Sequence, residues 1–468
     1  MTFIVTEKAC IQFLSYDKIV TVEVNCMYKN TYKLVIVGGG STWTPGLLKS
    51  LCLKKNLLSL YEIVLYDIDE NRQEKVGRFA SVLLKEEYPG LRLICTSDKQ
   101  KAYENVDLVF CQIRTGGMKM REQDEKIPLK HGCIGQETCG AGGLAYAMRS
   151  IPDMLEIIKD IREFSPKAWI LNYTNPTAIL SIAIQKKYPD DYRILNICDQ
   201  PINMLKSYAK VVGADYRSLT PVYFGLNHFG WFTHIYDRDK IDLLPRIKKH
   251  ILQHGFEPEN KADRDPSWLM TYSMVKDIIT LFPEYLPNTY LQYYLFPEYK
   301  VSQMNKNYTR ANEVMDGREK KVFAECIRVA ETGSAKGSFL AVNDTHAELI
   351  VNLAIAIMGN TKEQFVMIVQ NNGCIPNLSD DAMVEINTIV GKRGAVAIPV
   401  GKISSFYKGM IEQQYAFENL VCQAFFERSS DKLVQALTLN RTVVDGFKAK
   451  AILDDLMEAN QGFWPLLK

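Results

Sequence analysis

The sequence lacks the features that mark nucleic-acid-binding or membrane-spanning proteins. Its 56 Lys and Arg residues nearly balance 54 Asp and Glu residues, and the formal net charge is +2 at pH 7. A net charge so near zero provides no electrostatic reason to expect nucleic acid or an anionic membrane surface as a partner. No apolar run approaches the ~18 residues that a membrane-spanning helix needs. We therefore expect neither nucleic acid nor a membrane among the partners.

The cysteines also lack any pairing pattern. The chain has 11 of them, an odd number, scattered and without a C-x-x-C pair. In a chain of 468 residues this favours reduced thiols over a disulfide framework. The N-terminus does not resemble a signal peptide, because charged residues interrupt its apolar stretch, namely Glu7, Lys8, Asp17 and Lys18. The sequence predicts a cytoplasmic protein of two large lobes.

Residues 1–32 have no evident partner in the lobe that follows them. They contain modest alternating apolar patches, and Met27 stands shortly before Lys33, where a nucleotide-binding fold would begin. We expect residues 1–32 to be an N-terminal extension, with Met27 as the natural start of the protein. The alternative is an added edge strand.

Between residues 33 and 199 the chain alternates short apolar runs with helical patterns. Runs of strand composition occupy residues 34–37, 62–66, 91–95, 108–113, 168–172 and 194–198, and helical patterns occupy residues 70–87 and 152–164. This alternation predicts an α/β fold with a Rossmann-like, doubly wound parallel sheet. Residues 200–468 predict a mixed α+β lobe for catalysis and oligomerisation. Its expected elements are helices 202–212, 318–331, 345–358 and 406–427 and a strand at 222–226.

The first strand ends in a glycine-rich turn, GGGSTWTP. Gly38 and Gly40 fill the first two positions of the dinucleotide-binding pattern G-x-G-x-x-G, but Trp43 occupies the third. The third glycine normally allows close packing of helix on strand, so Trp43 implies a shifted helix or a different cofactor geometry. We expect the helix to begin near Thr44. Asp67 ends the next strand, where an acidic residue binds the ribose of NAD; the alternative is a turn residue or a helix N-cap.

A thiol, a carboxylate and an imidazole follow two of the strand-like runs. Cys198 and Asp199 stand at the end of one run, and His228 stands just after the next. One Cys and one His with free coordination positions would make an open divalent metal site. The alternatives are a small core cysteine and a hydrogen-bonded histidine. His250 and His254 are a rival pair, although neighbouring lysines indicate a solvated helix face.

Other polar residues stand in segments that could face a substrate. Glu137 belongs to the glycine-dense GQETCGAGG, which is either a substrate-facing loop or a tight crossover. Asn175 follows a strand, so its amide could reach nicotinamide or substrate. Arg121 and Arg310 could bind phosphate, since a guanidinium is its natural receptor, or they could be surface residues. Tyr290 lies in an aromatic-rich segment that is either core or site wall.

Taken together, these segments resemble glycoside hydrolase family 4, the NAD- and metal-dependent glycosidases. The motifs GGGSTWTP, GQETCGAGG, NYTNP, NICDQP, GLNHFGW, NTYLQYY and TRANEVM stand in the family's order between about residues 33 and 464. The chain is most similar to the members that hydrolyse 6-phosphorylated α-glucosides, because Asp199 stands where β-specific members generally carry Asn. Trp43 is no departure within this family.

The resemblance implies a role for each candidate residue and a nucleotide fold of the lactate/malate dehydrogenase type. Cys198 and His228 would bind Mn²⁺, or another divalent metal, together with substrate oxygens. Asp199 would be the general acid and Tyr290 the base. NAD would be held by Gly38, Gly40, Ser41, Thr42 and Asp67. The phosphorylated sugar would be held by Arg121, Glu137, Asn175 and Arg310, with Glu137 a site residue of less certain role.

The implied reaction is hydrolysis without net oxidation. NAD⁺ would take a hydride from carbon 3 and Tyr290 a proton from carbon 2, after which the aglycone leaves, water adds and the hydride returns. The substrate would be maltose 6′-phosphate or a related disaccharide phosphate. Alternatives are a 6-phospho-β-glucosidase or α-galactosidase of the same family, a plain NAD-dependent 2-hydroxy acid dehydrogenase, and a non-catalytic NAD sensor. A homodimer or homotetramer is expected from the resemblance alone.

Overall fold

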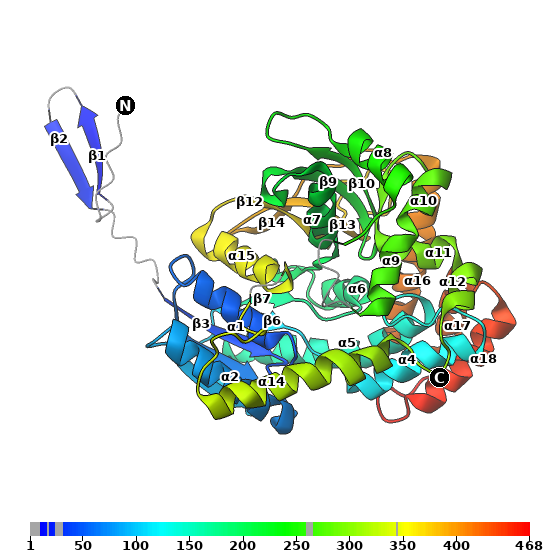
Figure 1. The fold of residues 1–468 in the computed structure, drawn as a ribbon, viewed down its shortest axis with the longest axis horizontal. Coiled ribbons are helices and arrows are strands. Elements are labelled where there is room, and N and C mark those ends of the chain that lie inside the picture. The colour runs from blue at the N-terminus through cyan, green and yellow to red at the C-terminus, as the bar shows by residue number, and fades with distance from the viewer. Residues whose placement is uncertain (1–9, 16–17, 24–30, 259–264, 343–344) are drawn as a thin grey trace.

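The computed structural model describes residues 10–15, 18–23, 31–258, 265–342 and 345–468 (Figure 1). Near the N-terminus, β1 (Cys10–Ser15) and β2 (Lys18–Glu23) pair antiparallel in a two-stranded sheet of their own. Within the described residues neither strand joins the large sheet, so the alternative of an added edge strand is not what the structure contains. The extension over residues 1–32, most of which lies outside the described residues, stays a prediction.

Six parallel strands form the heart of the large sheet. They are β3 (Tyr32–Val37), β4 (Leu60–Tyr66), β5 (Arg92–Thr96), β6 (Leu108–Cys111), β7 (Trp169–Asn172) and β8 (Ile194–Asn196). Their spatial order is β5-β4-β3-β6-β7-β8, in which the chain reverses direction across the sheet beside β3. This is the order of a dinucleotide-binding fold, with its ligand crevice at the carboxyl ends of β3 and β6. The predicted Rossmann-like fold is confirmed.

Three antiparallel strands from the second half of the chain extend this sheet. They are β12 (Glu363–Gln370), β13 (Met383–Gly391) and β14 (Gly394–Ala397). β12 pairs with β8 through Ile368 and Asn196, and β13 and β14 follow outward. The sequence pattern did not predict these strands as part of the sheet. One sheet therefore runs through both expected lobes, and the boundary between residues 199 and 200 stays a prediction.

Helices cover both faces of the parallel strands, as Figure 1 shows. Leu34 and Ile36 of β3 belong to one core with α1 (Thr44–Leu53), α2 (Glu70–Glu87), α14 (Lys320–Thr332) and α15 (Thr345–Gly359). Val35 and Val37 belong to the opposite core with α5 (Gly140–Phe164), α6 (Thr177–Lys187) and α16 (Ser405–Glu427). Successive side chains of a strand point to opposite faces, so burial on both faces explains the unbroken apolar run of β3.

The second lobe contains a smaller antiparallel sheet. It consists of β9 (Thr220–Leu226), β10 (Phe229–Tyr236) and β11 (Leu286–Pro287), and α7 (Gln200–Val212) leads into it. The remaining helices are α3 (Lys99–Tyr103), α4 (Gly117–Lys130), α8 (Leu244–His254), α9 (Pro266–Ser273), α10 (Val275–Leu281), α11 (Gln292–Leu295), α12 (Pro297–Gln303), α13 (Arg310–Glu313), α17 (Ser430–Leu439) and α18 (Gly446–Ala459). In the part of the chain that the structure describes, no helix is both long and apolar enough to cross a membrane.

Candidate active site

A cavity of about 1830 Å³ opens at the carboxyl ends of the parallel strands. A pocket for one small ligand typically has about 300–1,000 Å³, so this cavity has room for a cofactor and a substrate together. Of the predicted site residues, those that line it are Gly38, Ser41, Thr42, Asp67, Arg121, Glu137, Asn175, Cys198, Asp199, His228, Tyr290 and Arg310. Gly40 is not among the lining residues. The fold therefore gathers nearly all of the predicted site residues around one space.

The glycine turn after β3 is packed too closely for side chains. Gly38 has φ +81°, and a Cβ on it would lie 2.7 Å from the carbonyl oxygen of Gln112, which follows β6. A Cβ on Gly40 would lie 2.8 Å from the Cβ of Arg72 on α2. The backbone N–H of Gly38 donates to the carbonyl of Tyr66 at 2.9 Å. The turn is thus held by backbone contacts with two neighbouring strand ends, which is the geometry that a dinucleotide pyrophosphate needs.

Asp67 supports this turn from the end of β4. Its Oδ2 accepts a 2.7 Å hydrogen bond from the N–H of Gly40, and its Oδ1 accepts one of 2.9 Å from the N–H of Asp69. The N-cap of α2 is Asp69, whose side chain accepts from Arg72, so the N-cap alternative for Asp67 is wrong. Asp67 also lines the cavity. Contact with an NAD ribose stays a prediction.

Trp43 is the N-cap residue of α1, which begins at Thr44 as the sequence predicted. Its ring lies 4.8 Å from the ring of His346 on α15, with 20° between the planes. The closest approach of turn to strand falls at Gly39 instead, where a Cβ would lie 2.8 Å from the Cβ of Leu65. The position that carries the third glycine in other dinucleotide folds therefore contacts the second half of the chain here.

Cys198 and His228 form the centre of the site. The Sγ of Cys198 lies 3.4 Å from the Nε2 of His228, and Thr138 Oγ1 lies 3.1 Å from the other ring nitrogen, Nδ1. Two donors on one first-row metal ion, each about 2.0–2.3 Å from it, are about 3.1–3.6 Å apart. The 3.4 Å between Sγ and Nε2 therefore fits two ligands of one divalent ion. Within the described residues no third His, Cys, Asp or Glu side chain completes a group of three ligands, so such an ion would keep coordination positions for substrate.

A two-residue hairpin turn places His228 at this point. β9 ends at Leu226 and β10 begins at Phe229, and these two residues pair directly. His228 itself adopts φ +60°, a left-handed conformation that is uncommon for a residue with a side chain. The neighbouring Asn227 donates to Glu385 on β13 at 3.0 Å. The turn is therefore anchored to the large sheet, and its imidazole is aimed at Cys198.

Burial alters the protonation of both candidate ligands. Burial raises the pKa of the Cys198 thiol well above its ordinary value. Burial also lowers the pKa of His228 to about 4, which keeps the imidazole neutral at pH 7. A neutral imidazole is the form that binds metal, and a bound cation favours the thiolate. The positive charge of a bound ion would thus offset the unfavourable free energy of burying the Cys198 thiolate.

Asp199 and Tyr290 flank this pair. Asp199 follows Cys198 directly at the start of α7, where its Oδ2 accepts a 2.8 Å hydrogen bond from Asn203. The ring of Tyr290 stacks on His228 at 4.3 Å with 10° between the planes. Burial raises the pKa of Tyr290, and the guanidinium of Arg310 opposes that effect. The carboxylate therefore lies beside Cys198, and the phenol lies against His228.

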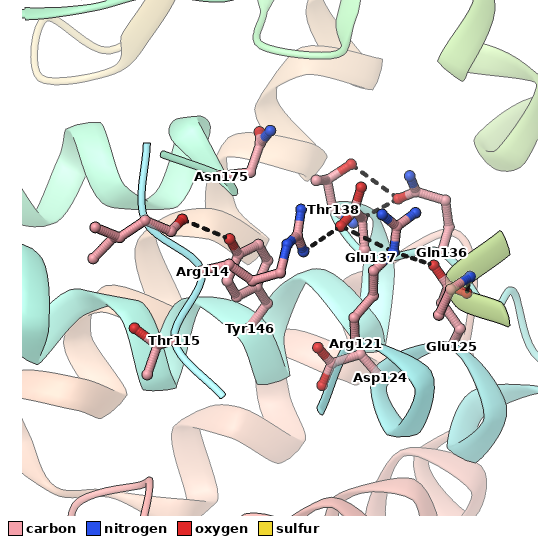
Figure 2. A network of polar contacts seen from close by, with 12 residues as sticks. Arg114, Thr115, Arg121, Asp124, Glu125, Gln136, Glu137, Thr138, Tyr146 and Asn175 are labelled. Carbon is pink, nitrogen blue, oxygen red and sulfur yellow. Dashed lines mark hydrogen bonds and ion pairs between the residues drawn. The ribbon is translucent and has the colours of Figure 1, made fainter. Parts of the chain in front are cut away.

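A network of buried charges surrounds Glu137 (Figure 2), whose charge also acts on Tyr290. Glu137 lies between two guanidinium groups, with Arg114 Nη1 at 2.5 Å and Arg121 Nε at 3.2 Å from its Oε2. Burial alone would raise the pKa of Glu137, but Arg114, Arg121 and Arg310 outweigh it and lower the pKa to about 2. Arg121 Nε also donates to Glu125 at 2.8 Å. Glu137 is therefore ionised throughout the physiological range.

Some guanidinium nitrogens in this network have no acceptor. Arg121 Nη2 and Arg310 Nε are buried and have no hydrogen-bond partner among the residues that the structure describes. Arg310 Nη2 forms a long ion pair with Asp265 Oδ2, at 4.0 Å. Asn175 lines the same cavity and adds an amide. Unsatisfied buried N–H groups on positive side chains are suited to an anionic ligand group.

Arg114 and Thr138 are site residues that the sequence did not predict. Arg114 follows the carboxyl end of β6, just as Asn175 follows a strand. Selecting the polar residues that follow each predicted strand would therefore have found it. Thr138 stands beside Glu137 in the chain, but only the fold brings its hydroxyl to His228. The rival pair, His250 and His254, has ring centroids 4.7 Å apart on α8; both are exposed and neither lines the cavity.

Comparison with known proteins assigns the chain to a family. The sequence model described as family 4 glycosyl hydrolase matches residues 33–214. The model described as family 4 glycosyl hydrolase C-terminal domain matches residues 223–443. The chain therefore belongs to family 4 of the glycosyl hydrolases, and the resemblance seen in the sequence motifs is confirmed.

Individual relatives share almost the whole of the chain. It is 49% identical over 439 residues to the phospho-alpha-glucosidase PagL of Clostridium acetobutylicum, covering 92% of this chain and 98% of that protein. A 6-phospho-alpha-glucosidase from gut microorganisms, solved in complex with NAD and Mn²⁺, has a TM-score of 0.92 and 49% identity, covering 94% of this chain and 100% of that one. A second such enzyme from gut microorganisms, solved with NAD and glucose-6-phosphate, has a TM-score of 0.90 and 42% identity, with the same coverage.

Proposed function

We propose that this family 4 glycosyl hydrolase is a 6-phospho-α-glucosidase. It hydrolyses maltose 6′-phosphate and related disaccharide phosphates to glucose 6-phosphate and an aglycone, with NAD and Mn²⁺. The observation that carries the proposal is a single cavity that joins the glycine turn, the Cys198–His228 pair and buried guanidinium nitrogens without acceptors. The likeness to PagL and to the two solved 6-phospho-alpha-glucosidases supports it.

Gly38, Ser41, Thr42 and Asp67 hold NAD, with Gly40 shaping the turn, and Cys198 and His228 hold the metal. When bound, NAD would supply a reversible hydride acceptor for carbon 3 of the sugar. The divalent ion supplies positive charge that stabilises developing negative charge on the sugar oxygens and lowers the pKa of the neighbouring phenol. Thr138 fixes the orientation of the His228 ring, as outer-shell partners of metal ligands do.

Tyr290 and Asp199 perform the proton transfers. Tyr290 removes the proton on carbon 2, because its ring lies against His228 and therefore beside any sugar bound at the metal. Asp199 donates a proton to the departing glycosidic oxygen and afterwards takes one from the water that adds to carbon 1. Its neighbour Asn203 holds Oδ2 at 2.8 Å and so directs the carboxyl group. No pair of catalytic carboxylates is needed.

The sugar phosphate binds where the guanidinium groups converge. Arg121 and Arg310 present N–H groups without acceptors, and Asn175 lies on the same wall. Glu137 holds Arg114 and Arg121 in place through its ion pairs and balances part of their charge. This arrangement favours a substrate with a phosphate over a neutral glucoside.

One assay tests the proposal against its rivals. The protein is incubated with p-nitrophenyl α-glucoside 6-phosphate, Mn²⁺, NAD⁺ and a thiol reductant, while nitrophenol and NADH are both followed. We expect nitrophenol release without net NADH formation, and little release from the unphosphorylated glucoside or from the β-anomer. Continuous NADH formation equal to nitrophenol release would contradict the proposal and favour a dehydrogenase.

We also propose a homodimer or homotetramer in the cytoplasm. The cytoplasmic location is supported by the nine cysteines whose side chains the structure describes, which are free thiols. The oligomer is supported by the family resemblance. Sedimentation velocity at micromolar concentration measures it, and a monomer at that concentration would contradict this part of the proposal.

A further inference from the structure

Arg318 contacts Trp43, the residue that breaks the glycine pattern. Its guanidinium carbon lies 4.8 Å from the centre of the Trp43 ring, a distance at which a cation is attracted to an aromatic face. The same ring stacks with His346 on α15. Trp43 belongs to the nucleotide-binding half of the chain and Arg318 to the second half, and both line the cavity. The tryptophan thus provides a platform that a glycine could not.

An irregular helical turn directs Arg318 into the cavity. α13 and α14 are joined by a π-helical turn, Val314–Glu319, that contains Arg318. A π-turn inserts one extra residue into an α-helix. The eight-residue step from Arg310 to Arg318 then acts as a seven-residue step, which returns to within about 20° of the same helix face. Without the insertion the two side chains would be about 80° apart around the axis. The π-turn therefore places Arg318 on the face that carries Arg310.

The surroundings of Arg318 match those of the two arginines already assigned to the sugar phosphate. Within the described part of the chain its Nε is buried without a hydrogen-bond partner, as are Arg310 Nε and Arg121 Nη2. Burial lowers the pKa of Arg318 to about 10, Asp265 opposes this, and the charges of Arg310 and Arg121 add to it. Three positive groups with unsatisfied donors in one cavity repel one another until an anion binds among them.

We propose that Arg318 is a third phosphate-binding arginine, which Trp43 holds in position. The inference rests on the proposed function and assigns to the same site a residue that the sequence did not indicate. The phosphate is that of the sugar and not the diphosphate of the cofactor, because the π-turn places Arg318 on the helix face that carries Arg310, whose Nε is likewise buried without a partner among the described residues. The charges of Arg310 and Arg121 act on Arg318 as well. Trp43 thereby links the nucleotide turn to substrate recognition.

Calorimetric titration of glucose 6-phosphate into the NAD- and Mn²⁺-loaded protein tests this inference. Arg318→Met should weaken glucose 6-phosphate binding by about 10–100-fold, which is the affinity that hydrogen bonds to a charged group typically contribute. Arg318→Lys should weaken this binding less, because the positive charge remains. NAD affinity, titrated separately, should change by less than about 3-fold. The matched control is Arg328→Met, because Arg328 lies on α14, pairs with Glu325 at 2.7 Å and does not line the cavity.

The Trp43 variants test the platform. Trp43→Leu should weaken glucose 6-phosphate binding by about 2–5-fold, the value of a cation–π contact, and Trp43→Phe should restore part of the loss. Thermal unfolding of each variant establishes that it is folded.

Two results would overturn the inference while leaving the proposed function intact. One is Arg318→Met binding glucose 6-phosphate as tightly as Arg328→Met does. The other is a loss of NAD affinity with glucose 6-phosphate binding preserved, which would assign Arg318 to the cofactor diphosphate. Wild-type protein that binds no glucose 6-phosphate would instead overturn the proposed function together with this inference.

Discussion

The two ends of the cavity are built in different ways. At the nucleotide end, Gly38 and Asp67 follow adjacent parallel strands, and the turn is held by backbone hydrogen bonds and by the carboxylate of Asp67. At the sugar end, side chains from widely separated segments meet, among them Glu137, His228 and Arg310. Substitutions should therefore act differently at the two ends. They should disturb shape and folding at the nucleotide end, and metal or anion binding at the sugar end.

The largest expected effect is at the metal pair. His228→Ala removes one of two protein ligands, so Mn²⁺ affinity should fall by more than the about 10–100-fold typical of outer-shell changes, and turnover should fall with it. Mn²⁺ binding is measured by electron paramagnetic resonance, with NAD binding by calorimetry unchanged. His234→Ala is the control, since His234 lies on β10, the strand that follows the His228 turn, pairs with Asp242 at 2.8 Å and does not line the cavity. Equal Mn²⁺ binding by both variants would refute the assignment.

The second prediction concerns Thr138, whose hydroxyl lies 3.1 Å from Nδ1 of His228. Thr138→Val keeps the shape and removes the hydrogen bond, so Mn²⁺ affinity should fall by about 10–100-fold. Thr138→Ser keeps the hydroxyl and should restore most of that affinity in the same measurement. If the serine variant were no better than the valine variant, the hydrogen bond would not be what matters.

At the nucleotide end, Gly38→Ala should act through the backbone. The new Cβ meets the Gln112 carbonyl at 2.7 Å and the residue keeps φ +81°, so stability should fall by about 1–3 kcal/mol. The displaced turn should also weaken NAD binding by about 10-fold. Gly213→Ala is the control, because Gly213 has φ +69° with nothing within 4 Å of a Cβ. It should lower the melting temperature without changing NAD affinity. Unchanged NAD affinity in Gly38→Ala would remove the distinction between the two ends.

The smallest effect should be the loss of folding stability as the pH falls and Glu137 becomes protonated. The folded-state pKa of Glu137 is lowered from 4.5 to about 2, so its ionised form stabilises the fold above pH 4.5, and this stabilisation is lost as pH falls toward 2. Between pH 7 and pH 4 the loss amounts to about 1 kcal/mol. Glu137→Gln should lack this component of the pH dependence, measured by urea unfolding at each pH. Parallel curves for the two proteins would contradict it.

Much of the nucleotide end could be predicted because its determinants are local. The six strand-like runs became β3 to β8, and the helical pattern at residues 70–87 became α2 with the same bounds. Glycines after a strand, followed by a helix start, report the turn without knowledge of distant residues. Because the carboxyl ends of parallel strands meet at one edge of the sheet, Cys198, Asp199 and Asn175 line one cavity, as their positions after strands predicted.

The sequence by itself determined the alternation of strands and helices, the glycine turn and most of the residues around the cavity. These follow from short-range periodicity and from the geometry of parallel strand ends. Only the tertiary structure decided that β12 to β14 extend the sheet, that Thr138 reaches His228 and that Arg318 lies on Trp43. Contacts between residues far apart in the chain depend on how whole elements pack. A single inserted residue in a helix, as at Val314–Glu319, changes which side chain faces the cavity.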